Sequence, residues 1–515
     1  MTIRKPEVDI TIIPDYQKEE NAEQMVLFVG QKTAAGTATS GQLYQSLGNA
    51  NEQDTLFGKT SALAAMVRAA KNINKITRFD AIPLSDSGTG VAATGEIKFT
   101  GTASAAGTIT VTIGSAINHQ YTLTVANLET ATVIGAALVA AMTADTTIPV
   151  VGVNTSGTVA ITVDNKGTYG NGITLKVDGT VAGITYTITG MASGANDPVL
   201  TSIFDVVGSL RYQTIIQPGT FVSTEVKNFL EPRFNSSNNI LDGVCIISVT
   251  HDYSTHISVL AADNQKSFAQ HCNLKINDTH HKGSALLELD DVIASQIGAI
   301  RALRLTQDAD ISRYVISPYG IRDNFGGPRI ASKPYFNTPF YNLPLIDVQH
   351  EFTDIQMTTL NAAGGFVLGN NRSHSSIILG EVVTTYKTDA ASNEDITFKY
   401  LNYVDTASNI REYFFNNLKE RFAQSRLTEG DVVPNVDMAN AGIIAAFLDG
   451  LYNDLSGEDY VLTQAGETAR KFFAAHRTVT LDLALGKATV SMMVPIVTQL
   501  RKIVVSMQIA FSTNS

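Results

Sequence analysis

The sequence predicts a multidomain protein of the α+β or α/β class. It consists of an α/β core interrupted by an inserted all-β sandwich domain, a C-terminal α+β domain, and extended β-strand arms at both ends. Three observations predict this. Apolar strands alternate with helix-like stretches outside the middle of the chain, a charge-poor stretch rich in Thr, Gly, Ala and Val separates them, and both ends show strand periodicity. A length of 515 residues suits several domains.

The predicted domain boundaries follow these changes in sequence texture. They are an N-terminal strand arm with its linker at 1–22, the first part of the core at 23–87, the inserted β-sandwich at 88–196, the second part of the core at 197–400, the C-terminal domain at 401–494, and a C-terminal strand arm at 495–515.

Both arms alternate apolar and polar residues, which is the period of a half-buried strand. We expect the apolar residues of both arms to form subunit interfaces by adding strands to a neighbour's sheet. These residues are Val8, Ile10, Ile12, Ile503, Val505, Met507, Ile509 and Phe511.

The core begins with predicted strands at 25–32 and 77–84, which flank a helix over 56–73. Short β-rich runs separated by glycines then predict the inserted domain, with one helix at about 130–144. The second part of the core alternates strands with helix-like stretches at 257–272 and 289–305.

The C-terminal domain opens with an amphipathic helix in which Ile410, Phe414, Leu418 and Phe422 recur every four residues. Further helices are expected at about 440–455 and 466–476, followed by an alternating strand at 477–486. Residues 489–500 are ambiguous, and their β-branched residues and proline favour a strand.

Composition excludes several functional classes. The net charge of −11 argues against nucleic-acid binding. No apolar run reaches the roughly 18–20 residues that span a bilayer, and the N-terminal stretch does not have the pattern of a signal peptide. With only two cysteines, a reducing compartment is the simpler expectation, so we expect the protein to be made and assembled in a cytoplasm.

No convincing catalytic or cofactor site emerges. The "FGKT" stretch at 57–60 resembles the end of a phosphate-binding loop, but Gln53 stands where the motif requires glycine, so a helix start is the better interpretation. Histidines and a cysteine cluster between 251 and 281 without metal-ligand spacing, which favours ordinary surface or turn residues. These are His251, His256, His271, Cys272, His280 and His281. We therefore expect no enzyme activity, cofactor or metal.

Several stretches spread over nearly the whole chain resemble the contractile tail sheath proteins of Mu-like bacteriophages. They include "MVLFVGQK", "AIPLSDSGTGVAATGEIKFTGTA", "DPVLTSIFDVVGSLRYQTIIQP", "YVISPYGIRDNFGGPRIASKPYFN", "LNYVDTASNIREYFF" and "MVPIVTQLRKIVVSMQIAF". None of these stretches is a catalytic motif. The resemblance rests on their residue composition and on their order along the chain.

The resemblance implies a structural protein of the virion that polymerises into six-fold rings stacked helically around a tail tube. On this reading the sheath contracts to drive the tube through the host envelope, and the subunit also meets baseplate and tail terminator proteins. The inserted domain would face outward and the C-terminal domain inward. Candidate tube-facing residues, chosen by position, are Lys419, Arg421, Arg470 and Lys471.

Two other classes stay open from the residues alone. One is a phage adhesion or receptor-binding protein that works through the inserted sandwich. The other is an α/β hydrolase-like enzyme whose site residues carry no known motif.

Overall fold

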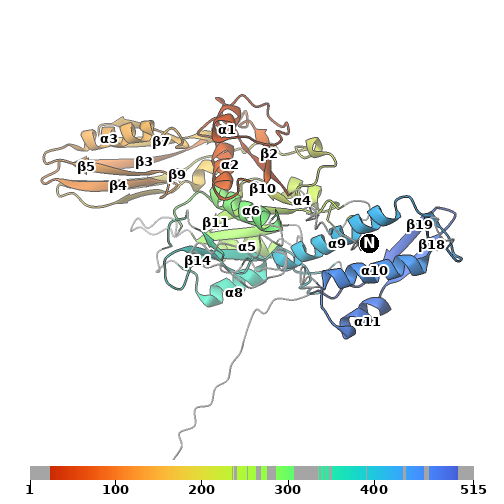
Figure 1. Ribbon diagram of the computed structural model, residues 1–515. Helices are drawn as coiled ribbons and strands as arrows, with labels where there is room; N and C mark the ends of the chain where they lie inside the picture. Colours follow the sequence, from red (N-terminus) through yellow and green to blue (C-terminus); the bar gives the residue numbers. More distant parts are fainter. Residues whose placement is uncertain are drawn as a thin grey trace, which may run out of the picture.

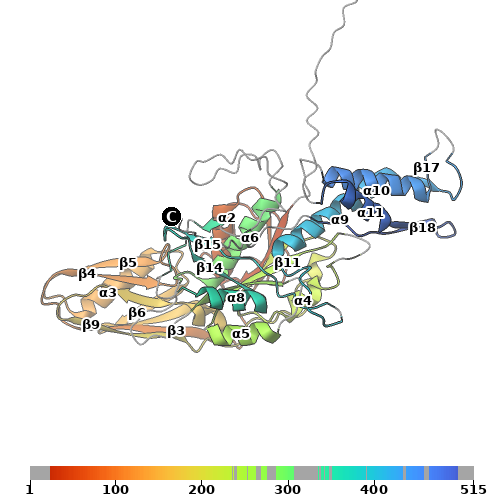
Figure 2. The ribbon, with the colours of Figure 1, turned by 90° about the horizontal axis from the view of Figure 1, so that it is seen from below.

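The structure is a computed structural model. It describes residues 24–234, 236, 240–251, 253–262, 268–274, 286–306, 335, 338–340, 343–346, 351–389, 391–432, 437–456 and 463–496. Figure 1 shows an elongated molecule with three parts in a row: a β unit at one end, a central sheet covered by helices, and a helical unit at the other end. Figure 2 shows the same order after a quarter turn. The mixed α/β, multidomain class expected from the sequence is confirmed.

The central sheet has eight strands in the order β13-β15-β14-β12-β11-β10-β1-β2. The strands from β14 to β2 pair in parallel, whereas β15 is antiparallel to both β14 and β13. Their bounds are β1 Met25–Gln31, β2 Arg78–Leu84, β10 Thr214–Ile216, β11 Val244–His251, β12 Phe268–Leu274, β13 Pro339–Phe340, β14 Gly365–Asn370 and β15 Ile377–Leu379.

Both faces of this sheet are buried, which explains why its strands read as nearly continuous apolar runs. Val26 and Phe28 of β1 point into one core cluster, whereas Leu27 and Val29 point into another. Helices α2 (Ala62–Ile73) and α6 (Asp290–Thr306) cover the first face.

The segment 200–221 and helix α4 (Thr224–Leu230) cover the second face. Further along the sheet, α5 (Tyr253–Ala262) and α8 (Asp354–Ala363) pack together over β14. On the first face, Gly298 allows α6 to lie close to the sheet, since a Cβ there would fall 2.4 Å from Cδ1 of Ile216.

The β unit consists of two antiparallel sheets and one helix. One sheet has the order β6-β7-β3-β9 and the other β5-β4-β8. Helix α3 (Ala131–Ala144) packs against both sheets, and buried residues from all three pieces form one apolar cluster. The strands are β3 Ala92–Gly101, β4 Gly107–Ile113, β5 Gln120–Val125, β6 Val150–Thr155, β7 Thr158–Lys166, β8 Leu175–Asp178 and β9 Ile184–Ala192.

The C-terminal unit is built on the helices α9 (Leu401–Phe422), α10 (Ala441–Leu455) and α11 (Glu467–Ala475). Strands β16 (Arg426–Leu427) and β17 (Met438–Ala439) form a short parallel pair. The start of α9 packs into the core of the central sheet and its later turns pack into the C-terminal unit. One continuous helix therefore joins the two parts.

The structure corrects two sequence expectations. The single helix predicted over 56–73 is two helices, α1 (Ala50–Phe57) and α2, because Gly58 has a positive φ of 83° and Ser61 caps the second helix. The helix-like stretch 257–272 ends with α5 at Ala262, and Phe268–Leu274 is a strand. That strand lies in parallel between β11 and β14, so sheet pairing decides its conformation.

Candidate functional site

A two-stranded antiparallel sheet stands at the far end of the C-terminal unit (Figure 1). It is formed by β18 (Thr478–Asp482) and β19 (Lys487–Ser491), with Val479 opposite Val490 and Leu481 opposite Ala488. Residues 483–486 make the turn, and Gly486 adopts a φ of 59°, which suits glycine. The strand expected over 477–486 forms at Thr478–Asp482, and of the stretch 489–500, for which a strand was favoured, the structure describes residues 489–491 as part of β19. The glycine followed by the alternating "KATVS" is the sequence signal for the hairpin.

The sheet has one apolar face and one polar face. Val479, Leu481 and Val490 are half-buried and pack on the helical core of the C-terminal unit. Thr478, Thr480, Asp482, Lys487, Thr489 and Ser491 form the pairs between these positions and therefore occupy the opposite face. The hairpin is thus held by one face only.

The helices beneath the hairpin are firmly packed. The rings of Tyr452 and Phe473 stack with centroids 4.5 Å apart, and Phe414 stacks on Phe473. The Arg477 guanidinium donates to the Asp449 carboxylate of α10 through both Nε and Nη2, with Nε 2.8 Å from Oδ1. This ion pair fixes the first residues of the hairpin to α10.

Neither edge of the hairpin is paired with a third strand in the part of the chain that the structure describes. An isolated two-stranded sheet is marginally stable in water, and unpaired strand edges are templates for another strand. Beyond β19, Ile496 forms an isolated antiparallel bridge with Thr463, which lies between α10 and α11. The hairpin is therefore a candidate place for added strands.

The strand-arm residues predicted from the sequence lie outside the described residues. This applies to Val8, Ile10 and Ile12 of the N-terminal arm and to Ile503, Val505, Met507, Ile509 and Phe511 of the C-terminal arm. Their role in subunit contacts stays a prediction.

The four candidate tube-facing cations are all exposed. Lys419 and Arg421 lie on the last turn of α9, and Arg470 and Lys471 lie on α11. Two of them have partners within the chain: Arg421 pairs with Asp437 at 3.4 Å, and Lys471 pairs with Glu467 at 3.1 Å. Exposed pairs of this kind contribute little to stability, so these side chains can exchange partners at low cost.

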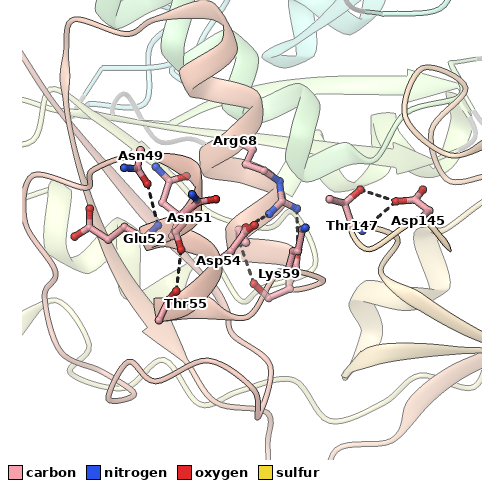
Figure 3. Close-up of polar contacts among 12 residues, drawn as sticks. Asn49, Asn51, Glu52, Asp54, Thr55, Lys59, Arg68, Asp145 and Thr147 are labelled. Carbon is pink, nitrogen blue, oxygen red and sulfur yellow. Dashed lines mark hydrogen bonds and ion pairs between the residues drawn. The ribbon is translucent and has the colours of Figure 1, made fainter. Parts of the chain in front are cut away.

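The "FGKT" stretch is a junction between two helices, as Figure 3 shows. The Arg68 guanidinium folds over the junction, with Nη1 2.5 Å from the Asp54 carboxylate and Nη2 donating to the Lys59 carbonyl at 2.9 Å. The stretch expected to start a helix instead holds the last residue of α1 and the link to α2, which begins at Ala62.

Of the histidines considered as metal ligands, His280 and His281 lie outside the described residues, and His256 is buried on α5. Within the described ranges, no group of three or more His, Cys, Asp or Glu side chains is arranged to hold a metal ion. Among the helices described here, none combines the length and apolar character needed to span a bilayer.

Comparison with known proteins gives one relative at the sequence level. The "Mu-like prophage FluMu tail sheath protein" of Haemophilus influenzae is 32% identical to this chain over 251 residues, which are 47% of this chain and 50% of the relative. The chain thus matches about half the length of that relative. The resemblance to Mu-like tail sheath proteins is confirmed by this homologue. No protein-family model matches the chain.

Solved structures of sheath proteins align over almost the whole chain at low identity. A sheath tail protein of Listeria innocua aligns at 12% identity over 93% of this chain and 92% of its own, with a TM-score of 0.46. The helical sheath of the anti-feeding prophage in its contracted state aligns at 11% identity over 99% of both chains, with a TM-score of 0.45. Likenesses at this level carry no functional argument.

Proposed function

We propose that this protein is the sheath subunit of a contractile phage tail. It is a structural protein rather than an enzyme and uses no cofactor. The observation that carries this proposal is the 32% identity to a Mu-like tail sheath protein over 251 residues. The subunit polymerises into six-fold rings stacked helically around a tail tube, and the sheath contracts to drive the tube through the host envelope.

We propose that β18–β19 accepts strands from neighbouring subunits. Its two open edges leave room for the arm containing Val8, Ile10 and Ile12 and for the arm containing Ile503 to Phe511. Each added strand would lay alternate apolar side chains over the same helical core that already covers Val479 and Leu481. For one arm, the free energy gained by burying apolar side chains nearly equals the entropy cost of ordering its residues. Strong binding therefore arises from many arms together.

The molecule's elongated form supports a radial orientation. The β unit and the α9–α11 unit lie at opposite ends of the central sheet in both views (Figures 1 and 2). We propose that the β unit faces outward and that the C-terminal unit faces the tube, with Lys419, Arg421, Arg470 and Lys471 as candidate contacts. The further partners are baseplate and tail terminator proteins. The subunit is assembled in the host cytoplasm, resides in the virion, and neither binds nucleic acid nor inserts into a membrane.

Electron microscopy of the purified full chain tests the class of protein. We expect hollow tubes at high concentration, whereas discrete monomers or trimers at every concentration would favour the alternative, an adhesion or receptor-binding protein. The comparisons do not favour that alternative.

A pair of substitutions tests strand donation. Ile509→Asp places a charge on the apolar face of the arm, and burying an unpaired charge costs several kcal/mol. We expect Ile509→Asp to abolish sedimentable polymer, while the matched variant Gln508→Asp still assembles. Circular dichroism verifies folding of both. Equal effects of the two substitutions would contradict the proposed face.

A further inference from the structure

The β unit and the central core share one continuous apolar cluster. Ala62 and Ala69 of α2, Leu289 just before α6, and Val292 of α6 are buried among side chains of the β unit. The contact is close, because a Cβ on Gly114 of the β unit would fall 2.9 Å from Cδ2 of Leu289. We call the contact of the β unit with α2 and α6 the seam.

Polar groups fasten one side of the seam. Asn165 of β7 accepts a hydrogen bond from the backbone N–H of Ala62 at 3.0 Å and donates to the carbonyl of Lys32 at 3.0 Å. The Asp86 carboxylate accepts from Gln31 at 2.8 Å and from Asn165 at 3.1 Å. These bonds join the β unit to the ends of β1 and β2 and to the start of α2.

On the other side of the seam, the buried Glu288 carboxylate joins the β unit to the core. The Ser115 hydroxyl of the β unit donates to Oε2 of Glu288 at 2.7 Å, and the backbone N–H of Leu289 donates to Oε1 at 2.9 Å. The N–H of Ala116 donates to the carbonyl of Leu287 at 2.9 Å. Ser115 and Glu288 are both buried, so their contact is shielded from water.

A second acid lies one helical turn away at the same place. Asp291, in the first turn of α6, is buried, and its carboxylate accepts a backbone hydrogen bond from Gly219, while its Oδ2 has no hydrogen-bond partner among the described residues. A buried carboxylate without full pairing favours its neutral form. Glu288 and Asp291 thus place two acids in the closed contact between the β unit and the core.

The charged surroundings of these acids offer little compensation. The titratable groups that interact with them are Tyr169 of the β unit and the neighbouring Asp290 on α6, and Arg68 on α2 interacts with Tyr169. Arg68 is already engaged by the carboxylate of Asp54. On the β unit beside Ser115, His119 is bound to Asp145 at 2.7 Å.

We propose that the seam is a proton-dependent contact: the β unit docks tightly on the core while Glu288 and Asp291 are neutral, and the docking weakens when they ionise. Neutral Glu288 can still accept from Leu289 and exchange a hydrogen bond with Ser115, and neutral Asp291 avoids a buried charge that only the Gly219 backbone would solvate. This contact lies within one subunit, so the proposal does not depend on polymerisation.

The direction of the pH dependence follows from the buried acids. Burial raises the pKa of Glu288 from 4.5 to about 7 and that of Asp291 from 3.8 to about 8. Each acid has a higher pKa when the β unit is docked than when the seam is open. It therefore stabilises docking in full at pH values below its pKa in the open state. This stabilisation is lost as the pH rises to the pKa of the acid in the docked state. The seam is therefore tightest below about pH 4 and weakens up to about pH 8.

Amide hydrogen exchange of the full chain tests the proposal. The reporters are the amides of Ala62 and Ala116, which donate across the seam. After correction for intrinsic exchange rates, we expect their protection to fall at least tenfold between pH 5 and pH 8 and to level off above that. Protection that does not change with pH in the wild-type chain would overturn the proposal by itself.

Neutral isosteres supply the second arm of the test. The double variant Glu288→Gln, Asp291→Asn should keep its seam protected at pH 8 as at pH 5, and each single variant should remove part of the pH dependence. Glu394→Gln is the matched control, since Glu394 is exposed, and it should retain the wild-type profile. An unchanged pH dependence in the double variant or in both single variants would refute the role of the two acids.

Discussion

Among single residues, Asp405 of α9 links three elements, because it lies where α9 meets the central sheet and α6. Its carboxylate is 2.5 Å from Nη2 of Arg301 and also accepts a hydrogen bond from the Tyr335 hydroxyl. Arg301 donates in addition to the hydroxyl of Thr214 in β10 at 2.6 Å. Arg301 and Asp405 are both buried, so each needs the opposite charge of the other to offset the loss of its hydration.

We therefore predict that Asp405→Ala lowers the free energy of unfolding by about 3–5 kcal/mol, since it leaves the Arg301 charge buried without its partner. The matched control is Glu467→Ala, which breaks the exposed pair with Lys471 and should cost no more than about 0.5 kcal/mol. Urea denaturation measures both. Similar losses for the two variants would show that the Arg301 charge finds compensation elsewhere.

At the scale of elements, the β18–β19 hairpin differs from the central sheet because it is held by one face alone. Leu481→Asp puts a charge on the face that packs against the helices, and we predict a loss of about 1–3 kcal/mol with release of the hairpin. Thr480→Asp lies on the opposite, exposed face and should leave stability nearly unchanged. Urea denaturation followed by circular dichroism compares the two. A larger effect at Thr480 would reverse the assignment of the faces.

The strand arms can be tested as elements in the same way. We predict that removing residues 1–20 or 501–515 leaves a folded monomer that no longer forms tubes, because the hairpin then lacks an incoming strand. Sedimentation measures polymer, and circular dichroism verifies the fold. Normal polymerisation of either shortened chain would exclude strand donation by that arm.

At the scale of the whole molecule, the β unit is part of the fold rather than a freely hinged addition. Leu289, just before α6, and Val292 of α6 are 5% and 6% exposed and belong to the apolar cluster of the β unit. The α9 helix in turn runs from the core into the C-terminal unit without a break. These two connections tie the β unit and the C-terminal unit to the central core.

Replacing residues 88–196 by a short Gly/Ser bridge should therefore leave a core that aggregates, because the deletion uncovers apolar side chains on α2 and α6. We predict that adding Leu289→Gln and Val292→Gln to the deletion restores a soluble core. Light scattering and thermal unfolding compare the two shortened chains. A soluble, equally stable core without the two extra substitutions would show that the seam contributes little.

The sequence by itself determined the local elements whose pattern is strong. The apolar run of β1, the four-residue spacing of Ile410, Phe414, Leu418 and Phe422 in α9, and the glycine-punctuated β runs of the inserted unit all form the expected structures. The period of the apolar residues indicates which face of an element is buried. Because apolar burial is the dominant favourable term in folding, such patterns predict the element from the sequence alone.

Only the tertiary structure decided how distant residues meet. The strand β12 was mistaken for part of a helix because its neighbours in the sheet, β11 and β14, determine its conformation. Ser115 and Glu288 are 173 positions apart, and Arg301 and Asp405 are 104 apart. Buried polar pairs of this kind leave no period in the sequence, since each residue is defined by a partner that only the folded chain brings within hydrogen-bond distance.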